Sequence, residues 1–300
     1  MTSRKVALFL ANPQNDYQQE LKEEALAAAA RAGLEIEVQF AGADSGRVSL
    51  DQPQQIYRAA GGAPEARPVA AIIFPLLDVA AVAKDVAKNG VGVVIIGRVP
   101  PFITELRHAH PSLPVFAVSP DQVEAGRLQG RQLLALLPTG GRVLYIQGNR
   151  LAPATGERTN GLTAALAGSA ITVSPTFGAW TAESGEEALS KWIRQPMNKL
   201  QLSAVACQND LMAVGVRAAI KSLAAEARFE YLREIPILGM DGSRTLGRKM
   251  VDAGELAATV VMPPVSRTAI ELLSRYLRGE SIPAAVMQEA KPYPPGLGTR

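Results

Sequence analysis

The chain repeats one pattern along most of its 300 residues: a short hydrophobic strand ends in a small polar cluster, and a helix follows. The cluster is rich in amides and carboxylates after the strands predicted at Val6–Ala11, Ala204–Cys207 and Ile235–Met240. Several strands are continuous runs of Val, Ile and Leu, which is typical of parallel strands covered on both faces. Ligands of such sheets bind at the carboxyl ends of the strands. The pattern therefore predicts an α/β protein that binds a small molecule with strand-end polar residues.

The boundaries of the elements follow from the hydrophobic period and from Gly, Pro and cap residues. In the first helix, Asp16 is the expected N-cap, Gln19 completes a capping box, and Gly33 ends the helix. Strands that alternate with helices imply right-handed crossovers, and the alternation is long enough for two parallel sheets. The expected strands are 6–11, 35–41, 69–74, 91–97, 115–119, 142–147, 171–176, 203–208, 235–240 and 257–262, and the expected helices lie near 16–32, 78–89, 121–137, 156–167, 184–194, 210–226 and 264–278.

The composition excludes several classes of protein. Hydrophobic residues make up 47 % of the chain and charged residues 20 %, as in globular and unlike disordered proteins. The formal net charge of +3 comes from scattered Lys and Arg, without the basic block of a nucleic-acid-binding surface. No apolar stretch reaches the ~18 residues of a membrane-spanning helix. We expect no direct nucleic-acid binding and no membrane insertion.

The few cysteine and histidine residues argue against a disulfide or a metal site. Cys207 is the single cysteine and lies in an apolar strand, so we expect a buried, structural thiol. The two histidines, His108 and His110, flank Ala109 beside Pro111 in a predicted loop. Without a cysteine partner or HExxH spacing, they do not predict a metal centre.

The sequence lacks the motifs of common enzyme classes. It has no G-x-S-x-G elbow, no Walker A sequence and no G-x-G-x-x-G after the first strand. Asp210 and Asp241 are candidates for a carboxylate pair, but nothing in the sequence brings them together. We expect a protein that is not an enzyme and that needs no cofactor.

The strand-end amides and carboxylates are suited to binding a polyol. Asn offers both donors and acceptors and ionised Asp offers acceptors, and together they satisfy hydroxyl groups that must donate and accept. Each of these residues also lies where a helix begins and could serve as its cap. We expect Asp16 and Asp210 to be caps, whereas for Asn15 and Asn209 capping and ligand binding both stay open.

Three larger side chains are further candidates. Trp180 lies in a loop between a strand and a helix, where its ring can stack on a sugar or heterocycle, or else pack under the loop. Trp192 lies in mid-helix and is expected in the core. Arg98 directly follows the strand at 91–97, either as a ligand donor or as a surface residue.

Seven ordered motifs carry a resemblance to a known family. The chain resembles the type I periplasmic binding proteins, in particular the ribose/galactose-binding branch that also supplies the effector domain of lactose-repressor-like regulators. The resemblance covers about residues 5–290. The motifs are Val6–Ala11 with Asn15 and Tyr17; Gly97-Arg98; Ser119-Pro120-Asp121 with Ala125-Gly126; Glu157 to Leu162; Gln208 to Gly215; Gly239 to Gly242; and Leu256 to Val260.

The resemblance implies two Rossmann-like lobes with parallel sheets, joined by a three-crossing hinge and closing on a ligand. The N-terminal lobe would comprise residues 1–120 plus 263–288, and the C-terminal lobe residues 121–262 plus 289–300. In this family Trp180 takes the place of a stacking aromatic residue, and Asp241 that of a hydroxyl-binding carboxylate. The implied ligand-binding residues are Asn15, Tyr17, Arg98, Gln122, Trp180, Asn209 and Asp241.

Several positions depart from the pattern of the family. Gly97 replaces a carboxylate, Gly156 an arginine and Met262 a polar residue that would bind the ligand, and Gln18 replaces an aromatic residue. Arg158 corresponds to the more structural arginine of the family. A buried hydroxyl without its partner costs about 1–3 kcal/mol. These departures predict a ligand that differs from a typical pentose, or a reorganised pocket.

The resemblance implies a non-enzymatic solute-binding protein for a sugar or a similar small polar ligand. Its partner would be an ABC permease or a sensor kinase. The alternative is the effector domain of a lactose-repressor-like regulator or an intracellular sensor, although the sequence contains no helix-turn-helix. Met1–Lys5 runs directly into the first strand without a secretory signal. As written, the chain is expected in the cytoplasm, and in the periplasm if a leader was removed.

Overall fold

The computed structural model describes residues 5–42, 45–75, 78–195 and 201–298. The chain divides into two compact units, Met1–Pro120 with Pro263–Gln288 (unit 1) and Asp121–Met262 with Glu289–Arg300 (unit 2). The start of the chain, on which the expectation about a secretory signal rests, lies outside the described residues. That the two units act as lobes of a closing protein stays a prediction.

Unit 1 contains one six-stranded parallel sheet in the order β11-β5-β4-β3-β1-β2. Its strands are β1 (Lys5–Leu10), β2 (Glu35–Phe40), β3 (Ala70–Ile73), β4 (Gly92–Ile96), β5 (Val115–Pro120) and β11 (Ala285–Gln288). Its helices are α1 (Asp16–Ala32), α2 (Ser45–Gly61), α3 (Ala80–Lys88), α4 (Ile103–Ala109) and α10 (Val265–Leu277), with a short 3-10 helix at Pro64–Ala66.

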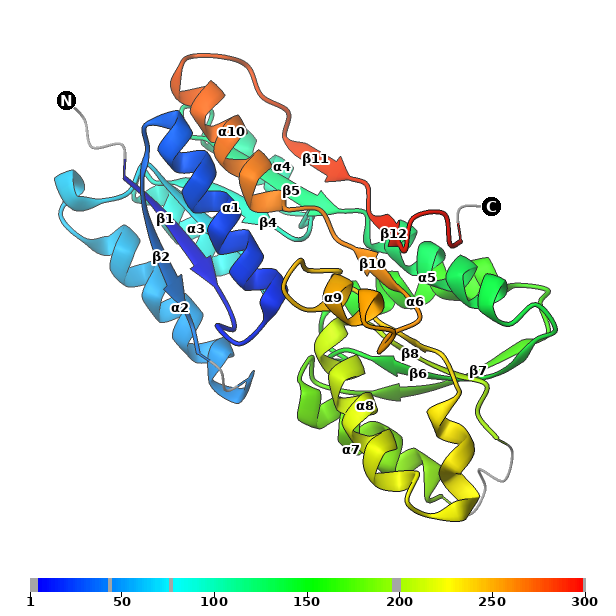
Figure 1. The fold of residues 1–300 in the computed structure, drawn as a ribbon. Helices are drawn as coiled ribbons and strands as arrows, with labels where there is room; N and C mark the ends of the chain where they lie inside the picture. The colour runs from blue at the N-terminus through cyan, green and yellow to red at the C-terminus, as the bar shows by residue number, and fades with distance from the viewer. Residues whose placement is uncertain (1–4, 43–44, 76–77, 196–200, 299–300) are drawn as a thin grey trace. The chain divides into compact units, whose positions relative to one another are not determined.

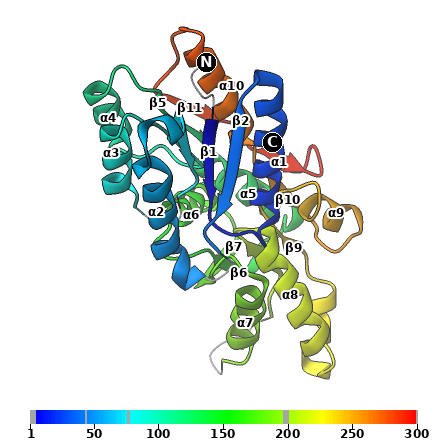
Figure 2. The same ribbon diagram turned by 90° about the vertical axis from the view of Figure 1, so that its left-hand side faces the viewer.

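Helices cover both faces of this sheet. Figure 2 shows α1 and α10 on one side and α2, α3 and α4 on the other. Strands β3 and β4 are buried along their whole length, so apolar residues on both faces are removed from water. This explains why their sequences are continuous apolar runs without alternation. Ser266 at the start of α10 donates a hydrogen bond to the Leu21 carbonyl of α1 and ties these two helices together.

Unit 2 contains a four-stranded parallel sheet in the order β7-β6-β8-β9 and a two-stranded antiparallel pair, β10 with β12. The strands are β6 (Gly141–Gln147), β7 (Ile171–Phe177), β8 (Ala204–Cys207), β9 (Ile237–Leu238), β10 (Thr259–Val261) and β12 (Lys291–Tyr293). The helices are α5 (Gln122–Leu136), α6 (Pro153–Leu166), α7 (Ala182–Ile193), α8 (Asp210–Leu223) and α9 (Gly247–Asp252), with a 3-10 helix at Ala227–Arg233.

The sheet of unit 2 separates two hydrophobic cores. Leu144 and Ile146 of β6 belong to the core under α7 and α8, whereas Val143 and Tyr145 belong to the core under α5 and α6. Figure 1 shows these two helix pairs on opposite faces of the sheet. The buried Gln129 of α5 donates to the carbonyls of Cys207 and Gly239 and so fixes this helix across two strand ends.

The predicted fold class is confirmed: parallel sheets with helices on both faces form two α/β units. Gly33 ends α1 in the left-handed conformation, with φ 64°, as predicted. Cys207 is buried, and its burial raises the pKa of the thiol. Trp192 lies in the core under α7 and α8. No helix in the described ranges is long and apolar enough to span a membrane.

The structure adds elements that the sequence pattern did not reveal. These are α2, α4, α9, β11 and β12. Helix α2 contains Pro53, which usually interrupts a helix. Helix α4 is only seven residues long, and it includes His108, so the prediction that both histidines lie in a loop was wrong. Strand β11 is half-exposed, without the apolar run that marked the central strands.

Candidate functional site

Arg158 of α6 holds together the strand-end residues of unit 2. Its side chain is 7 % exposed. Nε donates to Oε1 of Gln122 at 2.8 Å, and Nη1 donates to the carbonyl of Gln208. Nη2 lies 3.9 Å from Oδ1 of Asp241. One buried guanidinium therefore links the start of α5, the end of β8 and the loop that follows β9.

Trp180 lies directly beside this guanidinium. Cζ of Arg158 is 5.4 Å from the centre of the Trp180 ring, which allows a cation–π interaction. The indole packs against Gly148 after β6, where a Cβ atom would overlap with it. Nδ2 of Asn209 donates to the Trp180 carbonyl at 3.0 Å. Four predicted residues, Gln122, Trp180, Asn209 and Asp241, are thus brought together in unit 2.

A second set of hydrogen bonds, made by the buried Gln208, stabilises this cluster. The fully buried Gln208 accepts a hydrogen bond from the Gly148 amide at 2.9 Å through Oε1. Its Nε2 bonds to the Tyr145 hydroxyl at 2.9 Å and to Oγ1 of Thr159 at 3.1 Å. Burial raises the pKa of Tyr145 to about 12, so its hydroxyl stays neutral and available for this network. These hydrogen bonds fix the backbone of Gly148, on which the indole of Trp180 lies.

Asp210 fixes the loop that carries Asp241. The residue is 2 % exposed, and its carboxylate accepts hydrogen bonds at 2.7 Å from the Gly242 amide and from Oγ1 of Thr259. The two aspartates therefore have different roles. Asp210 holds the loop that carries Asp241, whereas Asp241 lies near Arg158. The structure does not support a catalytic carboxylate pair in unit 2.

Trp180 and Asp241 also share an unusual backbone conformation. Within the described ranges they are the two non-glycine residues with clearly positive φ, at 67° and 109°. Such conformations cost about 1–3 kcal/mol each and cluster at functional sites. Both residues were selected from the sequence as ligand-binding candidates, and that role stays a prediction.

The structure corrects the assignment of the helix caps. Asn15 caps α1, with Oδ1 accepting from the Gln18 amide at 2.9 Å, and Asn209 caps α8 through the Met212 amide at 3.0 Å. The prediction that Asp16 and Asp210 are the caps was wrong, because each is the first residue of its helix. The cap must have an extended backbone, and Asn15 and Asn209 have it.

In unit 1 the predicted residues lie at the carboxyl ends of β1 and β4. The Tyr17 hydroxyl donates to the Pro263 carbonyl at 2.9 Å. This hydrogen bond holds the backbone directly before α10. Arg98 is half-buried and follows β4. Strand β3 lies between β1 and β4, and the residue that follows it is Phe74, which was not among the predicted ligand-binding residues.

Gln18 explains one departure from the family pattern. Its Oε1 accepts hydrogen bonds from the backbone amides of Ala11 at 2.8 Å and Asn12 at 3.0 Å. The side chain thus satisfies the end of β1. In place of the expected aromatic residue, Gln18 thus stabilises the loop before α1 with two hydrogen bonds.

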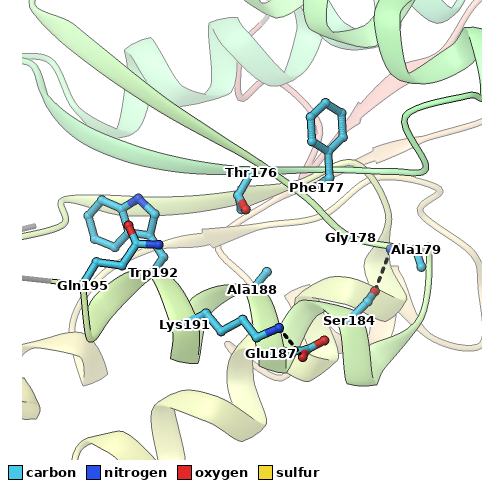
Figure 3. A pocket seen from close by; sticks show the side chains of 10 residues that line it. All are labelled: Thr176, Phe177, Gly178, Ala179, Ser184, Glu187, Ala188, Lys191, Trp192 and Gln195. Atoms are coloured by element: carbon cyan, nitrogen blue, oxygen red, sulfur yellow. Dashed lines mark hydrogen bonds and ion pairs between the residues drawn. The ribbon is translucent and has the colours of Figure 1, made fainter.

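A separate pocket of about 290 Å³ opens between β7 and α7 in unit 2. Figure 3 shows its lining, which includes Phe177, Trp192 and the ion pair between Glu187 and Lys191 at 2.5 Å. None of the predicted ligand-binding residues lines it. The candidate site is therefore the cluster around Arg158, and not this pocket.

Replacing Gly148 by alanine is expected to displace the indole of Trp180 from the strand end. The added methyl group would overlap with the ring, whereas at Gly156 the same methyl group would meet open space. We expect G148A to shift tryptophan fluorescence to longer wavelength and to increase its quenching by acrylamide. G156A is the matched control and should leave both unchanged. An unaltered spectrum in G148A would contradict this position of Trp180.

Comparison with known proteins identifies the family. Residues 6–281 match the family model of the periplasmic binding protein domain. The chain belongs to this family. The ribose import binding protein of Salmonella typhimurium is 27% identical over 190 residues, which are 61% of this chain and 60% of that protein. The ribose import binding protein of Escherichia coli is 26% identical, with the same coverage. The matches thus span less than two thirds of these relatives.

Solved structures of the same fold cover nearly the whole chain. One is an ABC transporter periplasmic solute binding protein from Actinobacillus succinogenes with bound D-allose; its TM-score is 0.81 at 17% identity, and 98% of each chain is covered. Another is the Caulobacter myo-inositol binding protein, with a TM-score of 0.79 at 21% identity and coverage of 100% of this chain and 96% of that chain. The resemblance seen in the sequence is confirmed. The homologues of this family member are solute-binding proteins and not enzymes.

Proposed function

We propose that this protein binds a sugar or a sugar-like polyol and presents it to an ABC permease. The observation that carries the proposal is the cluster around Arg158. It places a cation, a carboxylate, amides and an indole ring at the carboxyl ends of the strands of unit 2. Relatives named as ribose import binding proteins support the ligand class and the partner.

The chemistry of the cluster suits a hydroxylated ring. Asp241 supplies acceptors, and the amides of Gln122 and Asn209 are of the type that offers both donors and acceptors. The guanidinium of Arg158 holds Gln122 and Asp241 in place. The indole of Trp180 offers a flat apolar surface for the C–H face of the ring. A ligand that binds a closed state of such a protein more tightly than the open state drives its closure.

A thermal-shift screen tests the function directly. The protein is heated with sugars, polyols, nucleosides and furanones in turn. A ligand present at 100 times its Kd should stabilise the folded state by about 2.7 kcal/mol. No shift in any of these classes would count against a sugar-binding function.

Two substitutions test the site once a ligand is found. W180A and D241A should each abolish most of the binding, measured by calorimetry, because they remove the stacking surface and the hydroxyl acceptor. F177A and D252A are the matched controls, since Phe177 is an exposed aromatic residue near Trp180 and Asp252 is an exposed aspartate in α9. The controls should bind as the parent protein does. Unchanged affinity in both W180A and D241A would remove the proposed site.

A further inference from the structure

The loop that carries Trp180 is held on both sides by one hydroxyl group, that of Ser184 in the first turn of α7. The Ser184 hydroxyl accepts hydrogen bonds from the Ala179 amide at 2.9 Å and from the Thr181 amide at 3.3 Å. It donates a third hydrogen bond to the Thr181 carbonyl at 2.8 Å. Figure 3 shows the bond to Ala179. Because a hydroxyl has one donor and two acceptor sites, that of Ser184 is fully used on the residues before and after Trp180.

These hydrogen bonds explain how Trp180 keeps its unusual backbone. A non-glycine residue with a φ of 67° persists only where the surrounding structure imposes that angle. The peptide group between Trp180 and Thr181 is bound at both ends, since its N–H donates to Ser184 and its carbonyl accepts from Asn209 at 3.0 Å. Two side chains from two helices, α7 and the cap of α8, therefore fix this peptide group.

The chain that leads into Trp180 is fixed as well. The Gly178 amide donates to the Gln147 carbonyl at the end of β6 at 2.8 Å, so the loop begins at a defined point of the sheet. A Cβ atom at Gly178 would lie 2.6 Å from Sδ of Met212 and 3.1 Å from Oγ of Ser184. Helices α7 and α8 therefore pack closely against this backbone, and the loop has little room for another path.

We propose that Ser184 is a positioning residue for ligand binding, because it holds Trp180 at the positive φ that accompanies the position of the indole beside Arg158. This inference rests on the proposed function and adds a residue that sets the affinity without contacting the ligand. Without the hydroxyl, the amides of Ala179 and Thr181 lose their acceptor, and Trp180 is released to the negative φ that tryptophan prefers. Only molecules with the indole in place stack on the ligand, so the apparent Kd rises as their fraction falls.

The variant S184A tests the positioning of Trp180 without any ligand. Its tryptophan fluorescence should shift to longer wavelength, and acrylamide should quench it more strongly than in the parent protein, because the half-buried indole of Trp180 leaves its place. The second tryptophan of the chain, Trp192, lies in the core of unit 2, so the change reports on Trp180. An S184A protein with the parental spectrum and the parental quenching would overturn the inference.

The variant T181A is the matched control for the helix. The Ser184 amide donates to Oγ1 of Thr181 at 3.2 Å as part of the cap of α7. T181A therefore weakens the start of α7 but keeps the Ser184 hydroxyl and its three backbone partners. Both variants should unfold at lower urea concentration than the parent, whereas only S184A should change the fluorescence. Equal changes of fluorescence in the two variants would mean that Ser184 acts through the helix cap alone, against the inference.

Calorimetry with a ligand from the thermal-shift screen tests the effect on binding. S184A should raise the Kd about tenfold, the increase expected if the indole is in place in about a tenth of the molecules. T181A should bind as the parent protein does. An unchanged Kd in S184A would overturn the inference and leave the proposed function standing. If no ligand binds to the parent protein, the proposed function fails, and the fluorescence of S184A still decides whether Ser184 positions Trp180.

Discussion

Replacing Arg158 by leucine is expected to lower the free energy of unfolding by at least about 3 kcal/mol. The change removes the donors to the Gln122 side chain and the Gln208 carbonyl, and it removes the guanidinium that lies 3.9 Å from Asp241. Burying acceptors without partners costs more than the hydrogen bonds themselves contribute. Urea unfolding measures the change in the midpoint. Sugar binding should be lost as well, because Arg158 aligns Gln122 and Asp241.

Arg150 provides the control for this prediction. It lies on the surface after β6, with Cζ 4.4 Å from the Phe177 ring centroid, so R150L removes a similar side chain outside the buried cluster. We expect R150L to lower the free energy of unfolding by less than about 1 kcal/mol, which is the contribution of an exposed cation–π pair. R158K keeps the positive charge but loses the planar guanidinium with its several donors. Its free energy of unfolding should therefore lie between those of the parent protein and R158L. An R158L protein as stable as R150L would show that the cluster does not hold unit 2 together.

The second large effect is expected from Asp210, which has no direct role in the proposed ligand contacts. D210A removes the acceptor of the Gly242 amide and of the Thr259 hydroxyl, and each charge-assisted hydrogen bond contributes about 1.5–3 kcal/mol. Gly239 and Gly247 pack so closely on the carboxylate that a Cβ at either would overlap with it. Loss of the carboxylate should therefore loosen the loop that carries Asp241. Urea unfolding and hydrogen exchange of residues 239–243 measure the two effects.

Asp16 is the position-matched control for Asp210. Both are the first residue of a helix that an asparagine caps, but Asp16 is only half-buried. D16A should cost less than about 1 kcal/mol, the usual contribution of an acidic residue near a helix N-terminus. If D16A and D210A lower the free energy of unfolding equally, Asp210 stabilises only the start of its helix and not the loop that carries Asp241.

The arrangement of strands and helices was predictable because buried parallel strands and amphipathic helices leave strong local patterns. The caps of α1 and α8 were predicted one residue too late. Asn15 and Asp16 are both good caps, and which one serves depends on where the backbone becomes helical. That difference of one residue is decided by the hydrogen bonds of the loop, including those of Gln18 to Ala11 and Asn12.

The candidate site was predictable in part for a similar reason. Trp180, Asn209 and Asp241 stand out locally, because each is a polar or aromatic residue after a strand. Phe74 does not, since an apolar residue after an apolar strand is typical of the core. The ring of Phe74 packs closely against Gly97, which follows β4. This contact forms because β3 pairs with β4 and the ends of the two strands are neighbours. A relation between residues on different strands is a property of the sheet and not of any one segment.

The positive φ angles of Trp180 and Asp241 have a consequence for protein engineering. Glycine adopts such angles without cost, so a laboratory selection for heat resistance alone would favour glycine at both positions. It would thereby discard the indole and the carboxylate that the proposed ligand needs. Stabilised forms of this chain, as scaffolds for biosensors for example, should therefore be selected with ligand present or with these two codons held constant.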